Sequence, residues 1–259
     1  MNKLIRVKMA GLSSVVAIAV IGILMLILNE YPSLKEIVLG MPKNSVDPFT
    51  IQNTTILAFF IGLGELFLRW RASRAEFAYL NKSYLPEDDR IVLQSHDLAP
   101  ILQKVVKDVQ DEGAFLPNMI KRCVLQFQAS KSVDETNGLL SSLADIYFHQ
   151  IDLKYTLLRY VAWVIPTLGF IGTVKGIAGA LTYITAIVGN TDNTNTVQTA
   201  LQNITRELGI AFNTTIVALV LSAILVFLIY TVQEIEEKGI NKAVEYCLNN
   251  LINKLYTAA

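Results

Sequence analysis

The sequence predicts an all-α, polytopic membrane protein with four transmembrane helices and a helical cytoplasmic domain. Two observations carry this prediction. Hydrophobic residues make up 53% of the 259 residues and charged residues only 17%, whereas ordinary soluble domains carry about 25% charged residues. The apolar residues are also gathered in four runs, and each run is long enough to cross a bilayer, which takes about 20 helical residues.

The first run follows a basic N-terminus, and the chain carries no charge between Lys8 and Glu30. A secretory signal peptide is the competing interpretation, because such peptides also begin with basic residues. The run is longer, however, than the roughly 7 to 15 apolar residues of a signal peptide, and residues 29–32 offer no small-residue cleavage site. We therefore expect a retained transmembrane helix.

The other three runs lie at residues 53–70, 160–189 and 209–232. The run at 53–70 is the least apolar, because it includes Glu65 and ends in the aromatic and basic residues typical of a cytoplasmic interface. Glu65 and Arg69 are four residues apart on the expected helix. We therefore interpret them as an interfacial ion pair, in preference to an ion-conducting carboxylate.

The basic residues that flank the four runs predict the orientation of the chain. They gather before the first run, after the second, before the third and after the fourth, whereas the connectors at 29–52 and 190–206 hold just three. Cytoplasmic loops are enriched in Lys and Arg, so we expect both termini on the cytoplasmic side of a bacterial inner membrane. The predicted division is 1–70 for the first helix pair, 71–158 for the cytoplasmic helical domain, 159–232 for the second helix pair and 233–259 for a cytoplasmic C-terminal helix.

The predicted cytoplasmic domain carries helical patterns. Apolar residues recur at three- and four-residue spacing in residues 97–112 and 116–130, which indicates two amphipathic helices. A proline and several acids at 84–89 predict a turn that ends a helix continuing from the second run. Ser132 and Glu135 have the spacing of a capping box and predict the start of a long helix that continues into the third span.

Charge and cysteine usage exclude several classes of function. Lys plus Arg and Asp plus Glu both number 22, whereas a nucleic-acid-binding surface needs a clustered basic excess. Cys123 and Cys247 are far apart, and His96 and His149 lack metal-ligand spacing, so neither a disulfide framework nor a metal site is predicted. The sequence also holds no glycine-rich phosphate loop. We expect no enzyme activity and no cofactor.

Small residues fall on one face of each of the last two predicted spans. Gly172 and Gly176 form a GxxxG pair, which lets another helix approach closely. Packing accounts for the small residues as well as an ion pathway does, so both interpretations stay open on this pattern alone. The residues are Pro166, Gly169, Gly172, Thr173, Gly176, Gly179 and Ala180 in the third span and Ala211, Thr215, Ala218 and Ser222 in the fourth.

The same two spans contain a pair of motifs. Residues 165–177 read Ile-Pro-Thr-Leu-Gly-Phe-Ile-Gly-Thr-Val-Lys-Gly-Ile, and residues 208–219 read Leu-Gly-Ile-Ala-Phe-Asn-Thr-Thr-Ile-Val-Ala-Leu. The first resembles the P-x-x-G-x-x-G-T-V-x-G segment of the MotA/TolQ/ExbB proton-channel family. The second is similar to the following A-L-x-x-T-x-x-G-L helix, with Ala218 in place of the usual glycine. The branch is unassigned, because two spans precede the cytoplasmic segment as in flagellar members, whereas the Gly-Thr-Val motif is nearer to TolQ and ExbB.

The resemblance implies a homo-pentamer in the lipid bilayer around a single-span partner of the ExbD/TolR/MotB type, whose membrane Asp takes up the ion. Ion flow would drive this stator to do mechanical work. The resemblance places Thr173 and Thr215 at pore-facing positions, and we group Ser222 with them in the ion pathway. The expected ion is H⁺, with Na⁺ as the alternative because Asn213 and Thr214 add polar groups near Thr215. Helix and partner packing is assigned to Pro166, Gly169, Gly172, Gly176, Gly179, Ala211 and Ala218.

Charges within the spans bear on this hypothesis. No Asp occurs in any predicted span, and a proton relay needs titratable groups that face a wet cavity, so the acid must come from a partner. Lys175 is costly in a span, at about 2.5 to 3.5 kcal/mol, and a helical wheel places it about 160° from Thr173, off the pore-facing side. The alternative function is a non-conducting membrane scaffold that assembles through glycine-rich faces and recruits a soluble partner.

Overall fold

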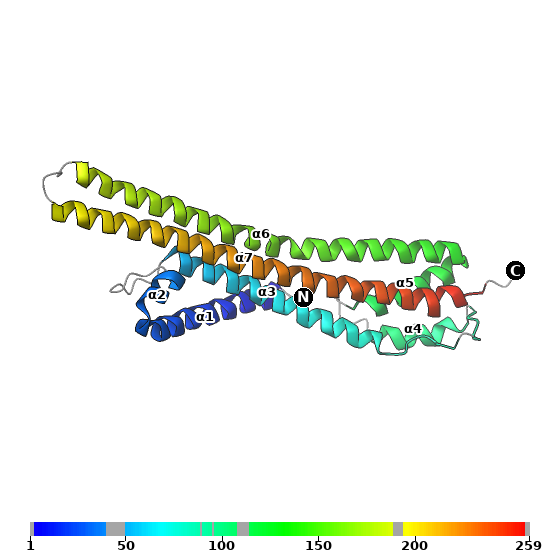
Figure 1. Cartoon of the computed structure of the whole chain (residues 1–259). Helices are drawn as coiled ribbons and strands as arrows, with labels where there is room; N and C mark the ends of the chain where they lie inside the picture. Colours follow the sequence, from blue (N-terminus) through cyan, green and yellow to red (C-terminus); the bar gives the residue numbers. More distant parts are fainter. Residues whose placement is uncertain are drawn as a thin grey trace. The chain divides into compact units, whose positions relative to one another are not determined.

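The computed structural model describes residues 3–39, 50–88, 90–94, 96–107, 114–188 and 194–256. Most of these residues are helical, and the only β-bridge among them pairs Leu93 with Leu255. The predicted all-α class is therefore confirmed (Figure 1). Within the described ranges, the α-helices are α1 (Lys3–Ile27), α2 (Pro32–Leu39), α3 (Ile51–Leu80), α4 (Leu98–Val106), α5 (Phe115–Ser130), α6 (Val133–Val188) and α7 (Thr194–Asn250).

Four helices, α1, α3, α6 and α7, are long and apolar enough to cross a membrane, which confirms the four predicted spans. α6 has 56 residues and α7 has 57. At 1.5 Å per residue each is about 85 Å long, whereas the hydrocarbon core of a bilayer is about 30 Å thick. Both helices therefore continue well beyond one bilayer, as the sequence predicted for α6 before its span and for α7 after its span.

The junction between α5 and α6 is a tight turn. Lys131 adopts the left-handed conformation, with φ at 53°, and its N–H donates to the Phe127 carbonyl to end α5. Ser132 Oγ then accepts a hydrogen bond from the Glu135 N–H at 3.2 Å, which satisfies one of the first backbone donors of α6. The Glu135 carboxylate accepts from Gln126 Nε2 at 3.3 Å, so half of the predicted capping box is formed.

Contacts between residues divide the described chain into two compact units. We call residues 3–66 and 157–229 the transmembrane unit, and residues 67–156 and 230–256, where described, the accessory unit. The divisions fall inside α3, α6 and α7, so each of these helices contributes one part to each unit.

In the transmembrane unit, α1, α2 and α3 pack together through Ile21, Leu39 and Ile56. α2 lies in the first connector, where the sequence predicted no helix. Its last carbonyl groups have no partner within the helix, and Thr50 and Gln52, at the start of α3, supply donors for two of them. Gln52 Nε2 donates to the Ile37 carbonyl and Thr50 Oγ1 to the Leu39 carbonyl, both at 2.8 Å. These bonds fasten the end of the short helix to the start of α3.

In the accessory unit, the C-terminal end of the chain holds the segment between α3 and α4. The Leu93 N–H donates to the Lys254 carbonyl at 2.7 Å, and the Tyr256 N–H donates to the Leu93 carbonyl at 3.0 Å. The Lys254 ammonium is buried and donates to the carbonyls of Pro86 at 2.8 Å and Asp88 at 3.1 Å. The predicted turn at 84–89 is non-helical where it is described.

The predicted amphipathic helices of the accessory unit are both present, with altered bounds. The helix expected at 97–112 is α4, Leu98–Val106, and residues 108–113 lie outside the described residues. The helix expected at 116–130 is α5, Phe115–Ser130. Cys123 of α5 is buried, and this burial raises the pKa of its thiol to about 12.

The accessory unit also buries two charges: Arg69, which was predicted to form an interfacial ion pair, and Glu236, for which nothing was predicted. Arg69 is 3% exposed, Glu236 is 7% exposed and Tyr155 is fully buried. The Arg69 guanidinium carbon lies 6.0 Å from the centroid of the Tyr155 ring. The Glu236 carboxylate is close enough to Arg69 for their charges to interact. One residue from each of α3, α6 and α7 thus meets in this unit, and buried opposite charges of this kind are costly to separate.

Candidate functional site

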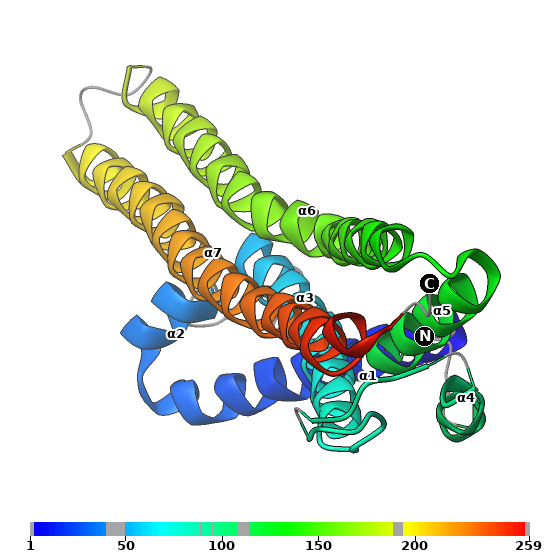
Figure 2. The same ribbon diagram turned by 90° about the vertical axis from the view of Figure 1, so that its right-hand side faces the viewer.

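The transmembrane parts of α6 and α7 lie side by side (Figures 1 and 2) and touch through the glycines of α6. A Cβ atom placed on Gly169 would lie 2.6 Å from Ala218 Cβ, and one placed on Gly176 would lie 2.5 Å from Ala211 Cβ. Carbon atoms do not approach this closely, so the contact requires glycine on α6 and a small residue on α7. We call this contact the α6–α7 interface.

Thr173 and Thr215 meet in the α6–α7 interface. Their Oγ1 atoms are hydrogen-bonded to each other. Both hydroxyls also lie within hydrogen-bonding distance of the Gly169 carbonyl oxygen, at 3.2 Å for Thr173 and 3.0 Å for Thr215. The Ala211 carbonyl is a further acceptor for Thr215 at 3.4 Å. The two predicted pathway threonines thus form one cluster with backbone oxygens.

The chemistry of this cluster follows from its donors and acceptors. Each hydroxyl has one proton to donate and can also accept, so two protons are shared among the two hydroxyls and the carbonyls of Gly169 and Ala211. Lone pairs are therefore left over for a further donor or a cation. The cluster holds no group that titrates near neutral pH, so it can line a path for an ion but cannot store a proton.

Ser222, the third predicted pathway residue, lies opposite a break in the α6 hydrogen-bond ladder. Pro166 lies inside α6 and has no N–H, so it cannot donate to the carbonyl four residues earlier, at Ala162. Ser222 Oγ from α7 donates to that carbonyl at 3.0 Å. The structure therefore gives Ser222 and Pro166 a shared packing role, while ion conduction by Ser222 stays a prediction.

One charged residue of the α6–α7 interface, Glu207, was not among the predicted site residues. A Cβ atom placed on Gly179 would lie 3.2 Å from Glu207 Oε2 and 3.7 Å from its Cγ, so the carboxylate lies over this glycine. Glu207 was overlooked because it falls in the sequence just before the apolar run that begins at Gly209. The signal that could have found it is its four-residue spacing from Ala211, which continues the small-residue face by one turn.

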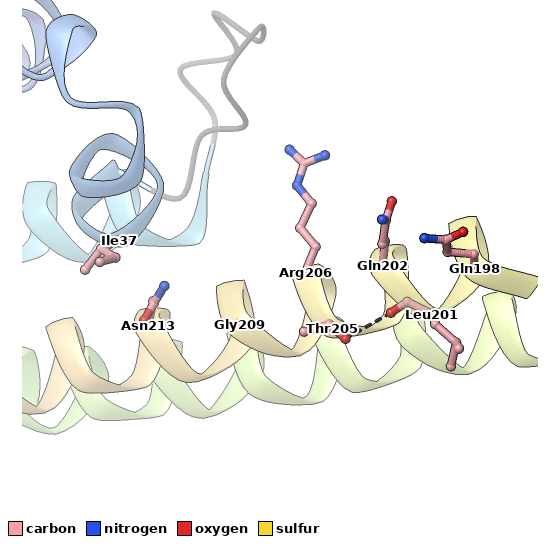
Figure 3. A pocket seen from close by; sticks show the side chains of 8 residues that line it. All are labelled: Ile37, Gln198, Leu201, Gln202, Thr205, Arg206, Gly209 and Asn213. Carbon is pink, nitrogen blue, oxygen red and sulfur yellow. Dashed lines mark hydrogen bonds between the residues drawn. The ribbon is translucent and has the colours of Figure 1, made fainter.

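Three other polar residues lie outside the threonine cluster. Lys175 is exposed, in agreement with its expected position away from Thr173. Thr214 faces Gly172 and donates to the Ile210 carbonyl of its own helix at 2.8 Å. Asn213 lines a groove of about 680 Å³ on another side of α7 (Figure 3). We call it the α7 groove; its lining residues are Ile37, Gln198, Leu201, Gln202, Thr205, Arg206, Gly209 and Asn213.

This placement bears on the sodium alternative, which rested on Asn213 and Thr214 as polar neighbours of Thr215. Their side chains are directed to the α7 groove and to Gly172, so neither adds an oxygen to the threonine cluster. The oxygens that the structure gathers there come from two hydroxyls and two backbone carbonyls.

The fold and this interface define a class: a four-span helical membrane protein whose last two spans pack through glycines and bring two hydroxyls together within the membrane. A profile of the MotA/TolQ/ExbB proton channel family matches residues 107–245, more than half of the chain, and the chain belongs to this family. The resemblance recognised in the sequence is thereby confirmed. Searches of curated proteins and of solved structures return no match.

Proposed function

We propose that this protein is the channel-forming subunit of a proton-driven motor, or stator, in the bacterial inner membrane. Five copies surround a single-span partner of the ExbD/TolR/MotB type, and both termini and the accessory unit lie in the cytoplasm. The observation that carries the proposal is the Thr173–Thr215 pair, two hydroxyls hydrogen-bonded across the α6–α7 interface in a chain of a proton channel family.

The need for a partner follows from the groups next to the hydroxyl pair, because Glu207 is eight residues away from Thr215. Residues 160–185 and 209–232 contain no Asp or Glu, and threonine hydroxyls do not bind or release protons near neutral pH. A proton that passes Thr173 and Thr215 therefore needs a carboxylate from another chain as its carrier. An Asp on a single partner helix meets this need, because the hydroxyls can donate hydrogen bonds to it when it is ionised.

The energy available for mechanical work comes from the membrane. A unit charge that crosses 100 mV releases about 2.3 kcal/mol. Coupling requires that the partner's carboxylate binds its proton from one side and releases it to the other while the two chains move relative to each other. The hydroxyl pair supplies a neutral, polar surface for the moving carboxylate, where a fixed opposite charge would trap it.

The test is partner-dependent ion leak. The chain is co-expressed with a single-span, Asp-bearing protein encoded beside it, and proton uptake into inverted vesicles is measured. Replacing Thr173 and Thr215 together by Val keeps the shape and removes both hydroxyls, so the leak should be abolished, while Thr→Ser at both positions should retain it. Measuring the flux with and without sodium then separates the two candidate ions.

The matched control is Thr205→Val. Thr205 is also a threonine of α7, but it lies in the α7 groove and its hydroxyl donates to the Leu201 carbonyl of its own helix. This variant should conduct like the wild type. Full leak in the double Val variant, with normal expression and assembly, would contradict the proposed pathway.

The scaffold alternative keeps a distinct expectation. In that hypothesis the glycine faces only pack helices, and Gly169, Gly172 and Gly176 each pack against α7 of the same chain. Under the scaffold hypothesis, the Val substitutions would leave the cellular function intact.

A further inference from the structure

Glu207 occupies the end of the α6–α7 interface. Its side chain is directed onto Gly179 of α6, where the absence of a Cβ leaves room for the carboxylate. Its own carbonyl lies against Gly176, 2.9 Å from the position that a Cβ there would take. Both glycines thus accommodate Glu207, and the side chain is half-buried between the two helices.

The carboxylate lies on the same face of α7 as the threonine cluster. Glu207, Ala211 and Thr215 follow one another at four-residue spacing, so they share one side of the helix. Eight residues separate Glu207 from Thr215, which is about 12 Å along the helix axis. Between them the small residues Ala211 and Gly176 lie against each other across the interface. A cation at Glu207 is therefore two helical turns from the hydroxyl pair.

The depth of Glu207 follows from α6. Tyr160 and Trp163 are exposed and stack at 6.1 Å between ring centroids, as expected for aromatic residues at a membrane interface. Gly179, which faces Glu207, is 19 residues beyond Tyr160, or about 28 Å along the helix. This distance matches the thickness of the hydrocarbon core, about 30 Å. With one boundary of the hydrocarbon core at Tyr160, the other boundary falls at the level of Gly179 and Glu207.

The charge of Glu207 is available to a mobile ion. Within the described ranges, no hydrogen bond or ion pair is recorded for its carboxylate. Arg206 is its neighbour in sequence, but Figure 3 shows the Arg206 side chain directed away from α6, on the side of the α7 groove. Lys175 is exposed on α6. A half-buried carboxylate at the end of an apolar interface attracts cations more strongly than one in bulk water.

We propose that Glu207 is a cation-receiving site at the extracytoplasmic mouth of the channel, which binds a monovalent cation and delivers it toward Thr173 and Thr215. This inference rests on the proposed function. For protons, hydronium transfers H⁺ to the carboxylate and leaves water, and the carboxylic acid later gives the proton to the partner's Asp. Five copies would place a ring of carboxylates around the entrance, and such focusing raises local cation concentration and entry rates about 10- to 1,000-fold.

The test is ion flux through the co-expressed complex in vesicles, measured over a range of external cation concentration. Glu207→Gln removes the charge and keeps the shape. It should raise the half-saturating concentration at least about tenfold and leave the maximal flux near that of the wild type, while Glu207→Asp should lie between the two. An unchanged half-saturating concentration in the assembled Glu207→Gln complex would overturn the site.

Two further variants keep the result unambiguous. Gly179→Ala places a methyl group where the carboxylate lies, so it should shift the half-saturating concentration in the same direction by a smaller factor. Arg206→Gln changes a charge at the same depth on another side of α7, and it should leave the half-saturating concentration unchanged. If Arg206→Gln lowers the half-saturating concentration as much as Glu207→Gln raises it, the cation responds to the general surface potential. That result would overturn a local site at Glu207.

The same measurements separate this inference from the proposed function. If Thr173→Val with Thr215→Val abolishes the maximal flux and Glu207→Gln changes nothing, the channel stands and the Glu207 site fails. If the double Val variant conducts like the wild type, the proposed pathway itself fails.

Discussion

Two sides of α7 in the transmembrane unit carry hydroxyl groups, and these hydroxyls bond to different partners. On the interface side, Thr215 and Ser222 donate to carbonyls of α6 at 3.0 Å. On the groove side, the Thr205 hydroxyl bonds the Leu201 carbonyl of its own helix at 2.9 Å. Residue type therefore does not decide the role of a hydroxyl here. What decides it is whether the opposing helix offers glycines and free carbonyls.

Glycine substitutions give the largest expected contrast between the two sides. Gly176→Ala puts a methyl group 2.5 Å from Ala211 Cβ and 2.9 Å from the Glu207 carbonyl, so it should destabilise the transmembrane unit by about 1 to 3 kcal/mol. Gly209 lines the α7 groove, and no atom lies within 4 Å of the position that its Cβ would take. Gly209→Ala should therefore stabilise α7 by up to about 1 kcal/mol.

The free energy of unfolding in detergent measures both glycine effects. The two variants differ from the wild type by the same single methyl group, so each serves as the control for the other. Equal changes of the same sign would show that the α6–α7 interface is not closely packed in the assembled protein.

A smaller effect is expected at Ser222. Its hydroxyl serves the Ala162 carbonyl that Pro166 leaves without a helical donor, so Ser222→Ala should cost about 1 kcal/mol of stability. In a Pro166→Ala background, the restored N–H can donate to that carbonyl, and Ser222→Ala should then cost much less. A double-mutant cycle on the free energy of unfolding measures this coupling. If the effects of the two substitutions on the free energy of unfolding simply add, and Ser222→Ala also loses ion flux, then Ser222 acts in the ion pathway and not in packing.

The sequence predicted those features that depend on local pattern. Four spans, the continuation of α6 before its span and of α7 after its span, and the start of α6 near Ser132 all follow from hydropathy, periodicity and capping. The start of α7 at Thr194 does not, because residues 190–206 were predicted to be a connector. Periodicity also placed Thr173 and Thr215 on the small-residue faces, and the family resemblance gave those faces a function. A helical wheel shows which residues share a face, and it does not show which helix that face meets.

The sequence could not predict long-range contacts, because a helical pattern does not show which residues of another helix it meets. Glu207 lies outside the apolar run by composition, and only the opposing Gly179 shows that it belongs to the interface. The Lys254 ammonium reaches the carbonyls of Pro86 and Asp88 across more than 160 residues. The assembly of Arg69, Tyr155 and Glu236 likewise joins three helices. None of these pairings has a periodic signature.

The most direct test of the account is water access to the two sides of α7 in the assembled complex. A cysteine is placed at Thr215 or at Ile216, and its reaction with a small cationic thiol reagent is timed. The native cysteines are buried, and the pKa of Cys123, raised to about 12, leaves almost none of its reactive thiolate at pH 8.

We expect Thr215→Cys to react, because its side of α7 faces the proposed ion path, and we expect the presence of the partner to slow this reaction. Ile216→Cys should stay unreactive, since Ile216, although 59% exposed in the single chain, would face lipid or a neighbouring subunit. Fast labelling of Ile216→Cys with an inert Thr215→Cys would contradict the claim that the hydroxyl pair lines the path of the ion.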